Sequence, residues 1–177
     1  MPVNQEISEA TIHKFIKTSV GDVFKTMLGV DAVLVKGTEQ AADEPWPPLH
    51  AAREGASPHV VGTVGFIGDA NGLIYLYLDL PFARRCTCHL LGMSDAELDE
   101  AGDEAINDAI AEVTNMSVGG FKNALCDYGY PCKLTIPSIL RGSSFCIEPI
   151  SSATRHIYHF DCGGHRVVAD ILMKFGD

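Results

Sequence analysis

The chain has 177 residues, of which 46% are hydrophobic, and a formal net charge of −10. This length suits one domain that buries roughly 70% of its unfolded surface, and the acidic balance argues against nucleic-acid or anionic-membrane binding, which needs clustered Lys and Arg. The sequence shows no signal-peptide pattern, no apolar run of ~18 residues, and too few cysteines, six, for a disulfide scaffold. We therefore expect a cytoplasmic protein with reduced thiols.

The N-terminal part predicts a long helix, a strand and a loop. Ser8 is suited to cap an amphipathic helix over residues 8–28, in which apolar or small residues recur three and four apart, and Gly29 is suited to end it. A short strand is expected at 31–36. Residues 37–58 are rich in proline and alanine without a usable period, so they predict a loop, with Trp46 folded over an edge of the core.

Two strands and a helix follow. Residues 60–67 and 73–80 alternate or run apolar in the way expected of buried strands, and the intervening Gly68–Gly72 has the turn residues of a hairpin loop. Pro81 is suited to the first turn of a helix. That helix is expected to end near Gly92.

The next stretch predicts a short helix leading into a long one. Ser94 and Glu97 have the spacing of a capping box. A break is expected at Gly102, followed by a helix over 103–127.

The C-terminal part predicts strands. Gly163–Gly164 between two β-rich segments is typical of a two-residue hairpin. The expected strands span residues 133–140, 144–150, 155–162 and 165–174. The whole pattern predicts an α/β (α+β) fold in which a large mixed or antiparallel sheet of about six strands carries two long helices.

The long helix over 103–127 has one apolar stripe and one polar face. The polar face carries Asp108, Glu112, Asn115, Gly119 and Asn123. Glu112 and Asn115 are three residues apart, so their side chains stand next to each other. Gly119 and Gly120 cost helix stability, which suggests that another backbone comes close to them.

A carboxylate next to an amide can orient a water molecule or bind a cation, but it provides no nucleophile. The plain alternative is that this face is simply solvated.

The run Asp108-xxx-Glu112-xx-Asn115-Met116, with Gly119-Gly120 and the later Pro137, resembles the signature of the CheC/CheX/FliY family. These proteins are phosphatases of the aspartyl phosphate on the chemotaxis response regulator CheY. The resemblance implies a CheC-like fold built from two helix-plus-strands halves, within one CheX-like domain over residues 1–177.

A weak internal repeat agrees with two halves, because residues 23–28 are similar to residues 120–125. Under this alignment Phe15 and Thr18 occupy the places of Glu112 and Asn115. The first half therefore lacks the polar pair, and the chain is more similar to CheX than to two-site CheC relatives.

The resemblance also implies a mechanism. Asn115 would orient the attacking water, and Glu112 would pair with a receiver lysine. Asp108, Gly119 and Asn123 would contact the partner. Mg²⁺ is expected on the receiver domain, with no metal or cofactor held by this chain, and a homodimer is expected. The alternative is a non-catalytic CheX-like adaptor for a receiver or a flagellar-switch partner.

Two cysteine–histidine groupings raise a third possibility, a metal-dependent enzyme. Cys86, Cys88 and His89 lie within about one helical turn, whereas zinc ligands usually stand two to four residues apart and number four. His159, Cys162 and His165 stand around the expected Gly163–Gly164 turn and could meet across a hairpin, but any such hairpin makes Cys162 and His165 cross-strand neighbours. Buried thiols and ordinary hairpin neighbours are the simpler interpretation of both groupings.

Overall fold

The structure is a computed structural model, and it describes residues 7–37, 58–143 and 151–176. The predicted loop around Trp46 and the predicted strand at 144–150 lie outside these residues. The helices are α1 (Glu9–Leu28), α3 (Leu80–Leu91), α4 (Asp95–Ala101) and α5 (Asp103–Asp127), and the strands are β1 (Val33–Lys36), β2 (His59–Gly68), β3 (Ala70–Asp79), β4 (Cys132–Leu134), β5 (Ser138–Gly142), β6 (Thr154–Cys162) and β7 (His165–Phe175). Within the described part, no helix is long and apolar enough to cross a membrane.

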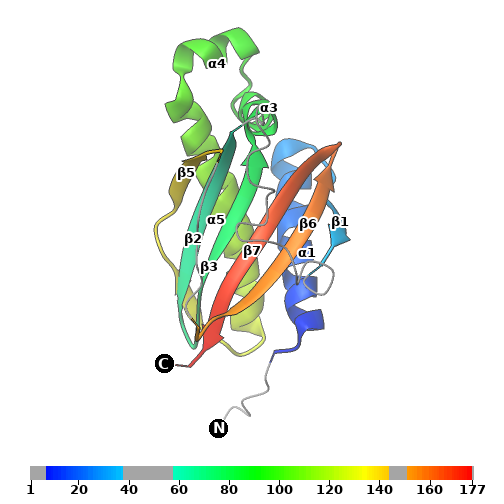
Figure 1. The fold of residues 1–177 in the computed structure, drawn as a ribbon, viewed down its shortest axis with the longest axis vertical. Coiled ribbons are helices and arrows are strands. Elements are labelled where there is room, and N and C mark those ends of the chain that lie inside the picture. The colour runs from blue at the N-terminus through cyan, green and yellow to red at the C-terminus, as the bar shows by residue number, and fades with distance from the viewer. Residues whose placement is uncertain (1–6, 38–57, 144–150, 177) are drawn as a thin grey trace.

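The strands form one antiparallel sheet in the order β1-β6-β7-β3-β2-β4, and β5 continues the edge by also pairing with β2. Figure 1 shows α1 and α5 lying on the same side of this sheet, with α3 and α4 at one end. Reversing the strand order exchanges β1 with β4–β5, β6 with β2, and β7 with β3. This exchange relates an N-terminal half, α1 with β1–β3, to a C-terminal half, α5 with β4–β7. The predicted CheC-like fold of two helix-plus-strands halves is confirmed.

The main core lies between the two long helices and the sheet. The fully buried side chains of the two helices recur three and four residues apart, as an amphipathic helix on a core requires. They include Ile12, Ile16, Val20 and Phe24 of α1 and Ile106, Ile110, Val113 and Phe121 of α5. A second, smaller buried cluster forms on the opposite face of the sheet around Val61, Tyr77 and Val168.

Two glycines fix where α5 lies. A Cβ added at Gly120 would stand 2.9 Å from the Cβ of Ser19, so Gly120 lets α1 and α5 approach closely. A Cβ added at Gly62 of β2 would stand 1.9 Å from Oγ1 of Thr114, so this strand needs a glycine under α5. Gly119 differs, because Cδ1 of Leu134 at 3.8 Å is the one atom of the described residues within 4 Å of a Cβ at that position. The predicted close approach therefore holds for Gly120 and not for Gly119.

The structure corrects the predicted strand at 133–140. The first stretch of pairing with β2 ends at Phe66 opposite Leu134. Pairing resumes with Thr63 opposite Ser138, and the register there is shifted by one residue. Thr135 stays paired with Gly65 through its backbone. Ile136 and Pro137 therefore both oppose the single residue Val64, which is a β-bulge.

This bulge divides the predicted strand into β4 and β5, and the sheet has seven strands in the described part of the chain, which agrees with the predicted number of about six. The hairpin between β2 and β3 is also tighter than the predicted Gly68–Gly72 loop. Pairing continues to Phe66 opposite Gly72, and the Asn71 side chain bonds the backbone of Gly68 at 3.0 and 3.2 Å. Because the hydrogen bonds of Asn71 close a short turn, both strands extend beyond their predicted ends.

Candidate functional site

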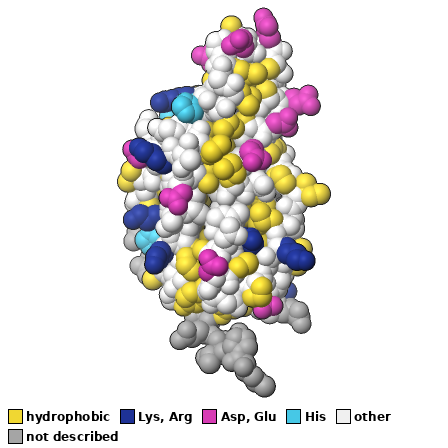
Figure 2. Space-filling view, turned by 180° about the vertical axis from the view of Figure 1, so that it is seen from behind, with side chains coloured by type: hydrophobic (Ala, Val, Ile, Leu, Met, Phe, Trp, Pro, Cys, Tyr) yellow, Lys and Arg dark blue, Asp and Glu magenta, His cyan; other side chains and the backbone are white. Residues whose placement is uncertain are grey.

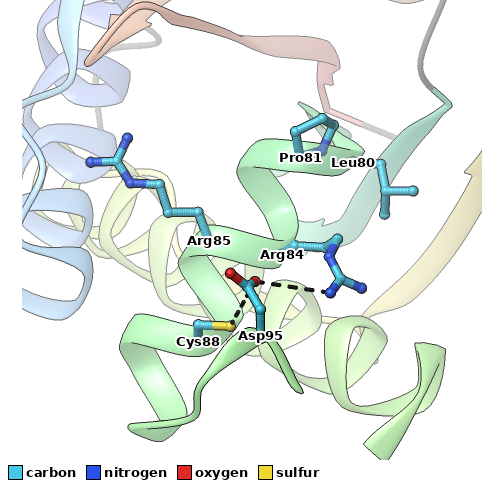
Figure 3. A pocket seen from close by; sticks show the side chains of 6 residues that line it. All are labelled: Leu80, Pro81, Arg84, Arg85, Cys88 and Asp95. Carbon is cyan, nitrogen blue, oxygen red and sulfur yellow. Dashed lines mark hydrogen bonds and ion pairs between the residues drawn. The ribbon is translucent and has the colours of Figure 1, made fainter. Parts of the chain in front are cut away.

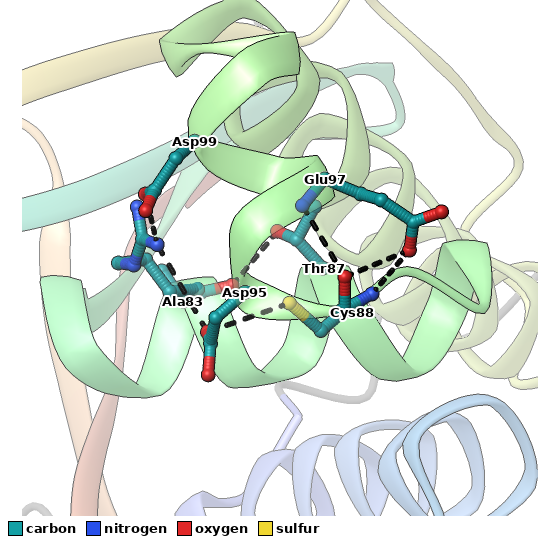
Figure 4. A network of polar contacts seen from close by, with 8 residues as sticks. Ala83, Thr87, Cys88, Asp95, Glu97 and Asp99 are labelled. Atoms are coloured by element: carbon teal, nitrogen blue, oxygen red, sulfur yellow. Dashed lines mark hydrogen bonds and ion pairs between the residues drawn. The ribbon is translucent and has the colours of Figure 1, made fainter.

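The entry to α5 is held by contacts with three other elements. Ser94 caps α4 and exchanges hydrogen bonds with Glu97, which confirms the predicted capping box. Arg84 of α3 bridges to Asp99 of α4 at 2.6 Å, and Arg141 of β5 pairs with Asp103 of α5 at 2.5 Å. Figure 4 shows Asp95, Glu97 and Asp99 of α4 beside α3. The α4–α5 corner is therefore tied to both α3 and the sheet edge.

The polar face predicted from the sequence points away from the core. Asp108, Glu112 and Asn123 are exposed, and Asn115 and Gly119 are half-buried. The side chains of Glu112 and Asn115 form no hydrogen bond or ion pair with another described residue. The structure thus brings all five predicted residues onto one accessible helix face and leaves the carboxylate and the amide available to a partner.

The β-bulge lies alongside Asn115. Along α5, Thr114 packs over Gly62, which pairs with Ile139, whereas Gly119 lies next to Leu134. The bulge falls between Leu134 and Ile139 on the neighbouring strand. It therefore runs beside the part of α5 that lies between Thr114 and Gly119, and this part contains Asn115. Pro137, far from Asn115 in sequence, lies in the bulge that runs beside this segment of α5.

The matching face of α1 has no polar pair. Phe15, at the place of Glu112 in the internal repeat, packs edge-on against Phe121 and Tyr128 at ring distances of 6.4 and 5.8 Å. Thr18, at the place of Asn115, is exposed. An aromatic side chain committed to packing cannot substitute for a carboxylate, so α5 alone carries the candidate site.

Acidic side chains surround the N-terminal half of α5. Figure 2 views the molecule from the side of the helices and shows acidic groups gathered towards its upper end. The exposed acidic residues of α4 and α5 in this region are Asp95, Glu97, Asp99, Glu100, Asp103, Glu104, Asp108 and Glu112. The field over Glu112 therefore favours a cationic group on any partner.

A separate groove lies between α3 and α4, and none of its lining residues belongs to the polar face of α5. It measures about 500 Å³ between α3 and the start of α4 and is lined by Leu80, Pro81, Arg84, Arg85, Cys88 and Asp95, as Figure 3 shows. Desolvation, and then the charge of Asp95, raise the pKa of Cys88. Burial raises the pKa of Cys86 to about 12. Both thiols stay protonated near neutral pH and provide no thiolate nucleophile.

His159 and His165 of the β6–β7 hairpin contact different side chains. Cys162 and His165 are direct cross-strand partners, as predicted. His165 Nδ1 contacts Asp79 at 3.2 Å, and His159 Nδ1 contacts Arg166 at 3.1 Å. No group of three or more His, Cys, Asp or Glu side chains among residues 7–37, 58–143 and 151–176 has an arrangement suited to a metal ion.

Comparison with solved structures supports the fold described above. The chain is similar to the chemotaxis protein CheX from Desulfovibrio desulfuricans, with a TM-score of 0.72 and 20% identity over 92% of this chain and 99% of that one. It is similar to CheX in the CheX–CheY–BeF3–Mg²⁺ complex from Borrelia burgdorferi, with a TM-score of 0.67 and 19% identity over 92% and 97%. FliY from Thermotoga maritima matches with a TM-score of 0.62 and 16% identity over 96% and 91%.

A search of curated protein sequences found no significant match. The family described as "Chemotaxis phosphatase CheX", in contrast, matches residues 60–161, which are more than half of the chain. The matched segment contains the polar face of α5, the bulge beside it and most of the sheet. With this match, and with a CheC-like fold carrying one polar face on α5, the chain belongs to the CheX family of chemotaxis phosphatases.

Proposed function

We propose that this chain hydrolyses the aspartyl phosphate of a CheY-like receiver domain, using Asn115 and Glu112 on α5. The observation that carries the proposal is that both side chains lie on the outward face of α5, where Glu112 is exposed and Asn115 is half-buried. The Borrelia burgdorferi CheX to which the chain is similar was crystallised with CheY, BeF3 and Mg²⁺. We extend a receiver-domain partner of this kind to the present chain.

Asn115 has the chemistry needed to hold an attacking water molecule. Its amide carries a carbonyl acceptor and two N–H donors, so it can fix a water in one orientation. In the docked complex this water would attack phosphorus in line with the aspartyl oxygen. The P–O bond to the aspartate breaks, and the products are inorganic phosphate and the free carboxylate. The half-buried position of Asn115 on α5 favours a defined side-chain orientation.

Glu112 has the position and charge of a docking residue. It stands one helical turn before Asn115 on the same face and is exposed. A receiver lysine that contacts the phosphoryl group would pair with its carboxylate, which fixes the orientation of the two proteins. Asp108, Gly119 and Asn123 complete the contact face around these two residues. Gly119 has the least bulk of them and leaves room for the receiver's backbone.

Mg²⁺ belongs to the substrate in this proposal. The receiver brings both the phospho-aspartate and the ion, and the ion neutralises charge on the phosphoryl oxygens. We expect this chain to need no metal or cofactor of its own. Catalysis then comes from positioning by Asn115, with most of the electrostatic stabilisation supplied by the receiver.

A phosphate-release assay tests the proposal. Receiver domains from the same organism would be phosphorylated with a small phosphodonor, and phosphate release would be followed with and without this chain. We expect at least one receiver to lose phosphate faster when the chain is present. A chain that binds phosphorylated receivers without accelerating release would instead be the non-catalytic adaptor. The expected cytoplasmic location remains a prediction and is not needed for the assay.

A further inference from the structure

Ile136 is the most exposed large apolar side chain in the described part of the molecule, at 87% of its surface. Isolated exposed apolar residues are common on proteins, so exposure alone assigns no role. The position of Ile136 is more informative. It belongs to the bulge that runs beside Asn115, at the edge of the candidate site.

The register of the sheet places Ile136 at the sheet edge next to α5. Leu134 packs against the helix-covered core and lies 3.8 Å from the Cβ position of Gly119. Ile136 and Pro137 follow it in the bulge and oppose Val64, whose side chain belongs to the same core. Ile136 therefore lies at the edge of the sheet beside the segment of α5 between Thr114 and Gly119.

The backbone holds Ile136 firmly in this position. The N–H of Thr135 donates to the carbonyl of Gly65 at 2.8 Å, and the N–H of Gly65 donates to Oγ1 of Thr135 at 2.8 Å. Pro137 on the other side has a fixed φ angle. An apolar side chain on a rigid backbone loses little conformational entropy when it is buried in an interface.

We infer that Ile136 is an apolar docking residue for the same receiver domain, contacting an apolar side chain on the rim of its phosphorylation pocket. This inference rests on the proposed function. A receiver whose phospho-aspartate reaches Asn115 must also cover the surface next to the helix, and this surface contains Ile136. Glu112 then provides the polar contact and Ile136 the apolar contact on two sides of the reacting group. Ile136 acts on affinity and touches no reacting atom.

The test compares Ile136→Ala with Ile67→Ala. Ile67 is also an exposed isoleucine, at 63% of its surface, and it lies on β2 opposite Lys133 of the edge strand β4. Its neighbour Phe66 points into the helix-covered core, so Ile67 projects from the opposite face. The pair therefore separates loss of a docking contact from loss of any exposed isoleucine.

The measurements are the affinity for a CheY-type receiver loaded with BeF3 and Mg²⁺, and kcat and KM for dephosphorylation. Ile136→Ala should weaken binding and raise KM roughly tenfold while kcat stays at the wild-type value. Ile67→Ala should change neither quantity. Ile136→Thr, which keeps the β-branched shape, provides a second test if alanine loosens the bulge.

The inference is overturned if Ile136→Ala and Ile136→Thr bind as tightly as the wild-type chain and Ile67→Ala. It is also overturned if Ile136→Ala lowers kcat with no change in affinity. These results leave the proposed function standing when the wild-type chain is an active phosphatase that Asn115→Ala inactivates. A wild-type chain that binds no receiver would remove both proposals together.

Discussion

Glu112 and Asn115 are neighbours on one helix face, yet their surroundings suit them to different tasks. Glu112 is exposed, and its long side chain can reach across an interface towards a cation. Asn115 is half-buried beside the bulge, and its short amide has few orientations available. A mobile carboxylate suits docking, whereas a positioned amide suits the orientation of water. The two residues should therefore respond differently to mutation.

Glu112→Ala should lower receiver affinity as well as turnover, because it removes the proposed ion pair. We expect a loss of affinity of about tenfold at low salt, shrinking as ionic strength rises and screens the pair in the wild-type chain. Titration calorimetry with a BeF3-loaded receiver measures the loss of affinity and its dependence on salt. Glu104→Ala, which removes an exposed glutamate two turns earlier on α5, is the matched control. Equal effects of the two substitutions would show that Glu112 contributes only to the overall negative charge of this face.

At the scale of elements, the position of α5 depends on glycines that serve different purposes. Gly62 and Gly120 are needed inside the molecule, since a side chain at either would meet Thr114 or Ser19. Gly119 has open space around it on the outward face, apart from Leu134. The two adjacent glycines therefore have different roles. Gly120 allows α1 and α5 to pack closely, and Gly119 keeps the outward face accessible.

A pair of substitutions separates these roles. Gly119→Leu should leave the fold standing, because leucine is the better helix former, while its bulk obstructs receiver binding. Gly120→Ala should lower the free energy of unfolding by about 1–3 kcal/mol through crowding against Ser19. Urea unfolding and receiver binding would be measured on both variants. A stable Gly119→Leu chain with undiminished affinity would show that the receiver does not approach this face.

Sequence reasoning placed most elements correctly because their signals are local. The capping box at Ser94 and Glu97, the glycine after α1 and the Gly163–Gly164 hairpin each depend on a few adjacent residues. The bulge at Ile136–Pro137 was missed because it depends on register with β2, which is a long-range property. Pro137 within a predicted strand was the available signal, since proline in a sheet is confined to edges and bulges.

At the scale of the whole molecule, the two halves share a fold but not a site. The strand order exchanges one half with the other, and α1 and α5 meet along the contact between Ser19 and Gly120. The polar pair exists on α5 alone. The six-residue repeat, together with the family resemblance, predicts this arrangement, since it aligns Phe15 and Thr18 with Glu112 and Asn115. The position of the bulge beside this segment of α5, in contrast, appears only in three dimensions.

The buried thiols predict loss of stability at alkaline pH. Burial raises the pKa of Cys86 and Cys162 to about 12, above the value of roughly 8.5 of an unfolded thiol. Their contribution is full below pH ~8.5 and is lost as pH rises towards 12. We expect the urea midpoint to fall between pH 8 and 10.5, and to fall less in a Cys86→Ala/Cys162→Ala double variant. Equal declines in both chains would contradict this account.

The homodimer expected from family likeness is a separate prediction about the whole molecule. Light scattering coupled to size exclusion should give twice the chain mass of 19.1 kDa. A mass of one chain at high concentration would contradict it, without affecting the site on α5.

The most direct test of the central claim is the effect of Asn115→Ala on the dephosphorylation of a receiver. The substitution removes the amide that would orient water and little other surface, so the receiver should still bind with nearly wild-type affinity. Turnover should fall on the order of 10²-fold or more, towards the receiver's own rate of phosphate loss. Thr18→Ala, at the equivalent place on α1, should retain full activity. Near-full phosphatase activity in Asn115→Ala would contradict the catalytic role of this helix face.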